Sequence, residues 1–209
     1  MKLTKYEHAC FTLEKDNQVI VVDPGAFATD FIAPEHVVAI IVTHDHFDHF
    51  DPELVASIIN ENPDAIIYAP ATVTAKIETF QAVSITEDTT ENVGPFTMRF
   101  LAGKHSLLHP SIPVTDNLSV LINDLLFYPG DSFTVPPFSV DTLALPASAP
   151  WLKVGEAMDY LAEVRPRFAF PTHDAILSAE GKEVTDDHIN WMAKECGVDY
   201  HRIESTEEI

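Results

Sequence analysis

Apolar positions along this chain recur with two different periods, which predict strands and helices in alternation. Short continuous apolar runs rich in β-branched residues, such as residues 37–42, are typical of strands buried on both faces. We expect strands at residues 10–13, 18–22, 37–42, 65–69, 82–85, 96–102, 118–122, 125–128, 142–145 and 168–170. Two of these runs flank Asn123-Asp124, a spacing that predicts a tight hairpin turn.

Helical periodicity fills the intervals between several of these strands. A helix should begin at Asp51-Pro52-Glu53, with Asp51 as the N-cap and Pro52 at the first helical position. An apolar stripe including Val154 and Leu161 predicts an amphipathic helix over residues 153–164. Further helices are expected at residues 72–80, 175–179 and 186–196. The pattern alone indicates a mixed α and β protein with β-α-β units.

Composition limits the size, the compartment and the partners of the protein. A chain of 209 residues that is 46% apolar fits one domain over residues 1–209. The formal charge of −21 disfavours nucleic acids and anionic membranes as partners. No apolar stretch reaches the length of a membrane helix and no apolar signal region opens the chain, so we expect a cytoplasmic protein without membrane insertion. A small-molecule substrate fits this picture, and homo-oligomerisation stays open.

A cluster of metal-ligand side chains follows the apolar run of residues 37–42. His44, His46, Asp48 and His49 leave the end of this predicted strand together. Imidazole and carboxylate groups suit zinc, manganese or iron(II). Their spacing is too tight for one tetrahedral site built from the loop alone, but it suits two adjacent metals that complete their shells elsewhere. The alternative is a surface turn that happens to be rich in histidine.

The pattern His-x-His-x-Asp-His after an apolar strand resembles the metallo-β-lactamase fold superfamily of dinuclear hydrolases. That resemblance implies three further ligands at later strand ends, and the chain carries His105, Asp131 and His173 in the expected order. It also implies an α+β fold, a four-layer αββα sandwich. By this resemblance the first metal is held by His44, His46 and His105, the second by Asp48, His49 and His173, and Asp131 bridges the two.

The same resemblance implies the chemistry. Two divalent ions, zinc or manganese, would share a bridging hydroxide that attacks a small ester, lactone or phosphorylated metabolite, with Asp48 and Asp131 closest to the catalytic step. His46 stands where the diiron flavoproteins of the superfamily have a carboxylate, which disfavours a redox role. Two alternatives stay open: a phosphodiesterase acting on nucleotides or phospholipid head groups, and a non-catalytic metal-binding sensor on the same scaffold.

Residues around the proposed ligands leave several interpretations open. The segments 6–10 and 19–24 are similar to a compact branch that contains ascorbate-6-phosphate lactonase and N-acylphosphatidylethanolamine phospholipase D, where an N-terminal histidine lies near the metals. His8 matches that position as a substrate contact, or it merely caps a strand. Asp23 either orients a metal-bound imidazole or serves an ordinary turn. His109 could contact substrate, although a surface loop is favoured, and Trp151 could wall a pocket or belong to the core.

Overall fold

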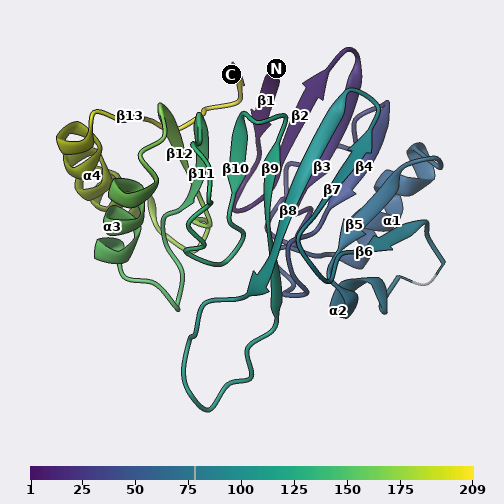
Figure 1. Cartoon of the computed structure of the whole chain (residues 1–209), viewed down its shortest axis with the longest axis horizontal. Coiled ribbons are helices and arrows are strands. Elements are labelled where there is room, and N and C mark those ends of the chain that lie inside the picture. The colour runs from purple at the N-terminus through teal and green to yellow at the C-terminus, as the bar shows by residue number, and fades with distance from the viewer. Residues whose placement is uncertain (78) are drawn as a thin grey trace.

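Two β-sheets packed face to face form the centre of the molecule, with helices on both outer faces (Figure 1). The structure is a computed structural model that describes residues 1–77 and 79–209. Helices α1 and α2 lie beside the first sheet, and α3 and α4 lie beside the second. The four-layer αββα sandwich expected from the resemblance is therefore confirmed.

The first sheet has seven strands in the order β14-β1-β2-β3-β4-β5-β6. Pairing from β3 to β6 is parallel, whereas β14, β1, β2 and β3 pair antiparallel. The strands are β1 (Lys2–Lys5), β2 (Phe11–Lys15), β3 (Gln18–Val22), β4 (Val37–Ile41), β5 (Ile66–Ala69), β6 (Ala82–Ser84) and β14 (Thr206–Glu208).

The second sheet repeats this division with the order β13-β12-β11-β10-β9-β8-β7. Pairing is parallel from β10 to β13 and antiparallel from β7 to β10. The strands are β7 (Thr89–Val93), β8 (Phe96–Lys104), β9 (Asp116–Ile122), β10 (Leu126–Tyr128), β11 (Thr142–Pro146), β12 (Phe168–Thr172) and β13 (Asp199–Tyr200).

Strands near the middle of the sandwich are apolar on both faces because each face meets a different partner. In β3, Ile20 and Val22 point into the core between the two sheets, while Val19 and Val21 belong to the core beneath α1 (Pro52–Glu61). Side chains of successive strand residues alternate between faces, so a strand covered on both sides must be apolar throughout. The continuous apolar runs in the sequence have this cause.

Two helices begin where the sequence predicts. The Asp51 carboxylate accepts hydrogen bonds from the backbone N–H groups of Glu53 (2.9 Å) and Leu54 (3.4 Å), and Pro52 opens α1. Helix α3 (Val154–Val164) follows Lys153 and buries Leu161 against the second sheet. The turn between β9 and β10 is also confirmed, since Asn123 and Asp124 both have positive φ, at 53° and 51°.

Three expected helices differ from the structure. Helix α2 spans only Ala71–Thr74 instead of residues 72–80, and residue 78 of that prediction lies outside the described residues. Of the two short helices expected at 175–179 and 186–196, the first is wrong because residues 175–178 are not helical, and the second is the later part of the longer helix α4 (Ala179–Cys196). Ser178 caps α4 by accepting a hydrogen bond from Gly181 N–H at 3.1 Å, so the glycine lies inside the first turn and does not interrupt the helix.

Four strands escaped prediction: β1, β7, β13 and β14, of which the last three lie at sheet edges. Each is short or strongly polar, and it exists because a neighbouring strand offers a ladder to pair with. Between β8 and β9 the chain leaves the sheet as a long loop that projects from one edge of the sandwich (Figure 1). Within the described residues, no helix is both long enough and apolar enough to cross a membrane.

Candidate metal centre

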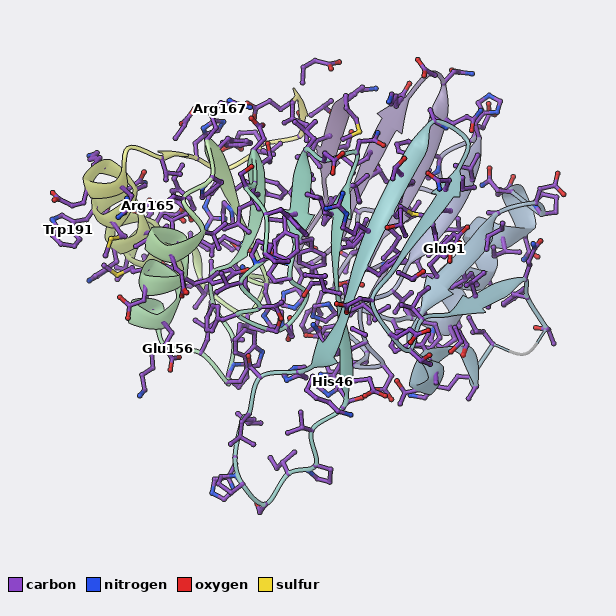
Figure 2. All side chains as sticks on the ribbon, in the orientation of Figure 1. His46, Glu91, Glu156, Arg165, Arg167 and Trp191 are labelled. Atoms are coloured by element: carbon purple, nitrogen blue, oxygen red, sulfur yellow. The ribbon has the colours of Figure 1, made fainter. Side chains whose placement is uncertain are left out.

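The strand ends at one edge of the sandwich bring all seven predicted ligands together. The loop after β4 carries four of them, and the ends of β8, β10 and β12 deliver the other three. The structure groups these side chains with His8 in overlapping sets whose ligand atoms lie within 4.8 Å of one another. The sets are His44, His46 and His105; His44, His49 and Asp131; and His8, Asp48, His49 and His173. In Figure 2, His46 lies at this edge, where the β8–β9 loop leaves the sheet.

Backbone hydrogen bonds and one glycine fix the loop that carries the first four ligands. The His46 carbonyl accepts hydrogen bonds from His49 N–H (3.1 Å) and Phe50 N–H (2.9 Å), which folds the loop into a tight turn before α1. Gly25 packs directly against this turn, because a Cβ atom at that position would lie 1.9 Å from the Asp48 carbonyl oxygen. A side chain at residue 25 would therefore displace the turn.

Asp23 is the hydrogen-bonding centre beneath the loop. Its two carboxylate oxygens accept from Thr43 N–H and from Thr43 Oγ1–H, each at 2.7 Å, and the Tyr128 hydroxyl donates to Oδ2 at 2.9 Å. Oδ2 also lies 2.7 Å from His49 Nδ1. Of the two interpretations left open for Asp23, the contacts favour the one in which it orients a ligand imidazole.

Three of the histidines direct Nε2 into the cluster because an acceptor holds Nδ1–H. His49 Nδ1 faces the Asp23 carboxylate, His105 Nδ1 lies 2.6 Å from the Ser106 carbonyl oxygen, and His173 Nδ1 lies 2.7 Å from the Ser148 carbonyl oxygen. Carboxylate and carbonyl oxygens only accept, so each of these nitrogens carries the proton. The Nε2 lone pairs are then available to a cation.

Asp131 stands in the middle of the ligand set. Its Oδ1 lies 3.2 Å from His49 Nε2, and its Oδ2 lies 3.0 Å from His173 Nε2 and 3.2 Å from His105 Nε2. The Trp151 indole N–H donates to Oδ2 at 2.9 Å. This carboxylate thus faces histidines of both proposed half-sites, as a bridging ligand does.

His8 belongs to the cluster without reaching the cavity above it. Its Nδ1 accepts a hydrogen bond from Ala175 N–H at 3.3 Å, so Nε2 carries the proton and donates to Asp48 Oδ2 at 2.9 Å. The side chain is buried, and its backbone has a φ of 57°. His8 does not line the cavity, so this geometry gives it no direct contact with substrate. Its hydrogen bond orients the Asp48 carboxylate.

Burial and mutual contact shift the pKa values of the clustered groups in opposite directions. Burial alone would raise the pKa of Asp48 and of Asp131, but hydrogen bonds and charge from neighbouring histidines hold both pKa values below the usual range. For His173, burial alone would lower the pKa, but Asp131 and Asp48 raise it to about 9. Burial lowers the pKa of His44 well below its usual value. Anionic carboxylates and imidazoles thus occupy one buried volume, as a cation site requires.

Unsatisfied atoms test whether these residues fit a metal. Within the described part of the chain, three buried polar atoms of the cluster have no hydrogen-bond partner: His49 Nε2, Asp131 Oδ1 and His173 Nε2. Leaving such atoms buried and unpaired costs about 1 to 3 kcal/mol each. Both histidine nitrogens face the Asp131 carboxylate, His49 Nε2 at 3.2 Å from Oδ1 and His173 Nε2 at 3.0 Å from Oδ2. Zinc and manganese accept nitrogen and oxygen ligands of these kinds. The residues fit a metal site.

An apolar cavity of about 460 Å³ opens over the cluster. Trp151 lines it, as expected for a residue near substrate. His109 does not, because its side chain is exposed on the β8–β9 loop and bonds the Ser111 hydroxyl at 2.7 Å. The residues that line the cavity are Asp45, His46, Phe47, Asp48, His105, Ser106, Leu108, Ile112, Pro113, Val114, Thr115, Asp131, Pro150, Trp151 and His173.

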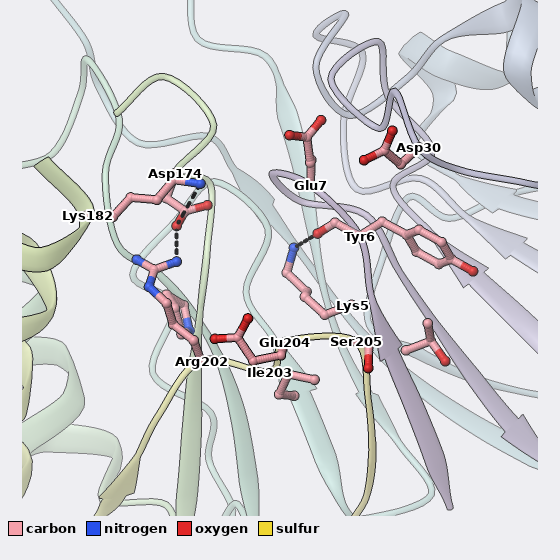
Figure 3. A pocket seen from close by; sticks show the side chains of 12 residues that line it. Lys5, Tyr6, Glu7, Asp30, Asp174, Lys182, Arg202, Ile203, Glu204 and Ser205 are labelled. Carbon is pink, nitrogen blue, oxygen red and sulfur yellow. Dashed lines mark hydrogen bonds and ion pairs between the residues drawn. The ribbon is translucent and has the colours of Figure 1, made fainter. Parts of the chain in front are cut away.

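A second cavity, of about 500 Å³, lies behind the ligand-bearing segment that ends β12 (Figure 3). Three of its charged side chains form a network: Arg202 bonds Asp174 as well as Asp186 outside the cavity, and Lys182 lies 3.8 Å from Asp174. Because Asp174 follows His173 directly, this network fixes the strand end that carries the ligand. We assign it a supporting role.

The sequence did not predict that the Trp151 indole N–H donates a hydrogen bond to Asp131. It also did not predict the hydrogen bonds from Thr115 and Lys76 to Asp45. Asp45 Oδ1 accepts from Thr115 Oγ1–H and Oδ2 accepts from Lys76, both at 2.8 Å. These contacts join segments far apart in the chain. No local pattern marks them, whereas a carboxylate at a strand end, as at Asp23, is a visible signal.

Comparison with known proteins agrees with this geometry. A protein-family model described as "Beta-lactamase superfamily domain" matches residues 2–173, a span that includes every proposed ligand. Protein Rv0786c of Mycobacterium tuberculosis is 36% identical over 190 residues, which cover 88% of this chain and 89% of that protein.

Two solved structures share the fold at low identity. The metallo-beta-lactamase fold protein YhfI of Bacillus subtilis superposes with a TM-score of 0.72 at 17% identity, covering all of this chain and 98% of YhfI. Igni18, a metallo hydrolase of the archaeon Ignicoccus hospitalis, gives a TM-score of 0.70 at 16% identity with the same coverage. At these identities the likeness concerns the fold.

Proposed function

The chain belongs to the metallo-β-lactamase superfamily of metal-dependent hydrolases, and on that premise we propose that it is a dinuclear enzyme that hydrolyses a small ester, lactone or phosphorylated metabolite. One observation carries the proposal: His49 Nε2, Asp131 Oδ1 and His173 Nε2 are buried, unpaired and convergent. Such an arrangement is stable only if a cation or a proton occupies the space between them.

We assign the first metal to His44, His46 and His105 and the second to Asp48, His49 and His173, with Asp131 between them. The grouping of ligand atoms within 4.8 Å supports this division. When bound, a pair of divalent cations lowers the pKa of water and neutralises charge on the attacked carbonyl or phosphoryl oxygen. Imidazole and carboxylate ligands suit zinc and manganese.

The chain's own side chains hold this site in shape. Asp23 and the carbonyl oxygens of Ser106 and Ser148 fix the rings of His49, His105 and His173, and His8 fixes Asp48. Preorganisation of this kind means that ligands do not rearrange during the reaction. In ester hydrolysis the C–O bond of the ester breaks, the hydroxyl group of water joins the carbonyl carbon, and its proton leaves with the alcohol.

Substitution of Asp131 tests the proposal. D131N keeps the size of the side chain, so the fold measured by circular dichroism should stay intact while turnover falls by at least about 100-fold and the metal content drops. D124N is the matched control, because Asp124 occupies an exposed turn with positive φ where asparagine is equally suited. Wild-type turnover in D131N, or wild-type protein that keeps no zinc or manganese after dialysis, would refute the assignment.

A further inference from the structure

Resting on the proposed hydrolase function, we propose that the substrate is uncharged apart from its reacting group and carries an apolar acyl or alkyl chain, which lies against the β8–β9 loop. The inference selects neutral esters and lactones over phosphorylated metabolites. Three features of the cavity support it: the composition of its wall, the way that wall is held, and its charge.

The wall of the cavity is aliphatic and exposed. Leu108, Ile112 and Val114 line it from the β8–β9 loop, with exposed fractions of 47%, 46% and 39%. Phe47 lines it from the loop after β4 and is 63% exposed. Keeping four large apolar side chains in water is unfavourable, and a cluster of them beside polar groups marks a binding surface. Its floor is the candidate metal centre, so the apolar partner must also reach the site of chemistry.

The loop is tied to the metal centre at both ends. Ser106 N–H donates to the Asp131 carbonyl at 2.8 Å, His105 N–H donates to the Thr115 carbonyl at 3.1 Å, and the Thr115 hydroxyl donates to Asp45 at 2.8 Å. The apolar wall therefore keeps a set distance from the ligands. A chain bound against it presents its carbonyl group to the cluster in a repeatable position.

The cavity provides no cation for a second charged group. Among the described residues that line it there are three aspartates and neither lysine nor arginine. Two lysines beside lining residues are paired with aspartates: Lys76 bonds Asp45, and Lys104 bonds Asp116. Lys153, two positions after Trp151, is exposed and does not line the cavity. A phosphate group is usually held by arginine, lysine or a helix N-terminus. With a chain charge of −21, a phosphate remote from the reacting bond would be repelled.

The size of the cavity sets the scale of the substrate. About 460 Å³ lies within the usual range for small-ligand sites. Each methylene group buried against the wall should raise kcat/KM by about twofold to fourfold until the cavity is filled.

The first experiment measures turnover by the zinc-loaded full chain on p-nitrophenyl acetate, butanoate and hexanoate, which share one leaving group. We expect kcat/KM to rise along the series. Mono-p-nitrophenyl glutarate differs from p-nitrophenyl pentanoate only in having a carboxylate in place of the terminal methyl group, and it should react at least about tenfold more slowly. Glucono-δ-lactone and its 6-phosphate form the second pair. A flat series, or preference for either anionic compound, would overturn the inference while leaving the hydrolase intact.

Substitutions locate the effect on the loop. L108S/I112S should flatten the chain-length series, so that kcat/KM for the hexanoate falls toward kcat/KM for the acetate. I32S/V184S is the matched control, because Ile32 and Val184 are also exposed aliphatic side chains and line no part of the cavity. If L108S/I112S instead lowers the molecular mass measured by light scattering and keeps the series intact, the loop covers a second copy of the chain and the inference is wrong.

A binding measurement separates this inference from the proposed function. In W191F, Trp151 is the one remaining tryptophan, and it lines the cavity. Hexanamide, a neutral analogue that resists hydrolysis, should change the fluorescence of Trp151 when it binds. L108S/I112S in the W191F background should bind hexanamide roughly tenfold more weakly. Binding of hexanamide without turnover of any ester would refute the hydrolase and keep the apolar site. Ester turnover without hexanamide binding would do the reverse.

Discussion

His49 Nδ1 lies 2.7 Å from Asp23 Oδ2, and both side chains are fully buried. Asp23 directly follows β3 and His49 belongs to the loop after β4, so this contact joins the ends of two parallel strands at the edge where the ligands gather. Because the carboxylate fixes which ring nitrogen carries the proton, it decides that Nε2 faces Asp131. A residue that touches no substrate thus prepares a ligand.

The first prediction concerns this contact. In D23N an amide NH₂ group replaces one carboxylate oxygen and faces N–H or O–H groups that also donate. The hydrogen bonds around residue 23 are then disrupted, and the His49 ring loses its orientation. We expect metal affinity to fall by about 10- to 100-fold, measured by competition with a chromophoric chelator. D16N is the control, because Asp16 lies in the exposed β2–β3 turn at a φ of 50° that asparagine tolerates. Equal affinities of D23N and wild type would contradict the orienting role.

A second prediction concerns His8. H8N keeps a residue that accepts positive φ but is too short to reach Asp48, so Asp48 loses its donor. We expect metal affinity to fall by about tenfold and kcat to fall more than KM changes. H36N is matched to it, since His36 also has a positive φ, of 63°, but is exposed and belongs to none of the metal-ligand groups. If metal affinity fell in both variants, the loss would come from the strained backbone at positive φ, and the orienting role of His8 would be contradicted.

A third prediction concerns the packing of Gly25 against the ligand loop. G25A places a methyl group on the Asp48 backbone, which cannot move without moving the ligands on either side of it. We expect unfolding free energy to fall by at least about 2 kcal/mol, with lower metal content, in denaturant titrations. G155A is the counterpart, because nothing lies within 4 Å of its added Cβ; alanine there should stabilise α3 by up to about 1 kcal/mol. A stable, metal-replete G25A protein would show that the turn yields.

The fourth prediction concerns pH and His201, which lies between Asp199 of β13 and Glu207 of β14, with both contacts at 3.1 Å. Partial burial would lower its pKa, but these carboxylates raise it above the usual value. A raised folded-state pKa stabilises the protein below the unfolded value of about 6.5 and loses that contribution as pH rises through the folded-state value.

H201Q should therefore be less stable than wild type near pH 5.5, by less than about 1 kcal/mol because the side chain is 43% exposed, and equal to it near pH 9. Thermal unfolding at the two pH values measures the difference. H188Q serves as the control, because His188 bonds the carbonyl oxygen of Val184 and not a carboxylate. A difference that grows with pH would reverse the assigned sign.

The sequence was sufficient for the elements whose cause is local. Asp51 and Pro52 mark the start of α1. Strands that are buried on both faces are visible in the sequence as continuous apolar runs. The residue pattern after β4 singled out four of the ligands, a resemblance implied the other three, and the structure brings all seven to one edge. Their assignment to two metals remains a prediction.

The rest depends on distant contacts. Strand β14 is polar and short, and it forms because β1 offers an open edge. The sequence predicts separate helices at residues 175–179 and 186–196, whereas Ser178 caps one helix, α4, and Asp186 within it pairs with Arg202. Nothing near position 151 in the sequence shows that the Trp151 indole would donate to Asp131. Such pairs are decided by which strands become neighbours.

The ligands are divided between the two sheets: His44, His46, Asp48 and His49 leave the first, and His105, Asp131 and His173 leave the second. Cations held among them would crosslink the two sheets at one edge of the sandwich. Removing the metal with a chelator should therefore speed amide exchange along the ends of β4 and β12. Because metal binds the folded state, tighter metal binding should also raise the free energy of unfolding measured in denaturant.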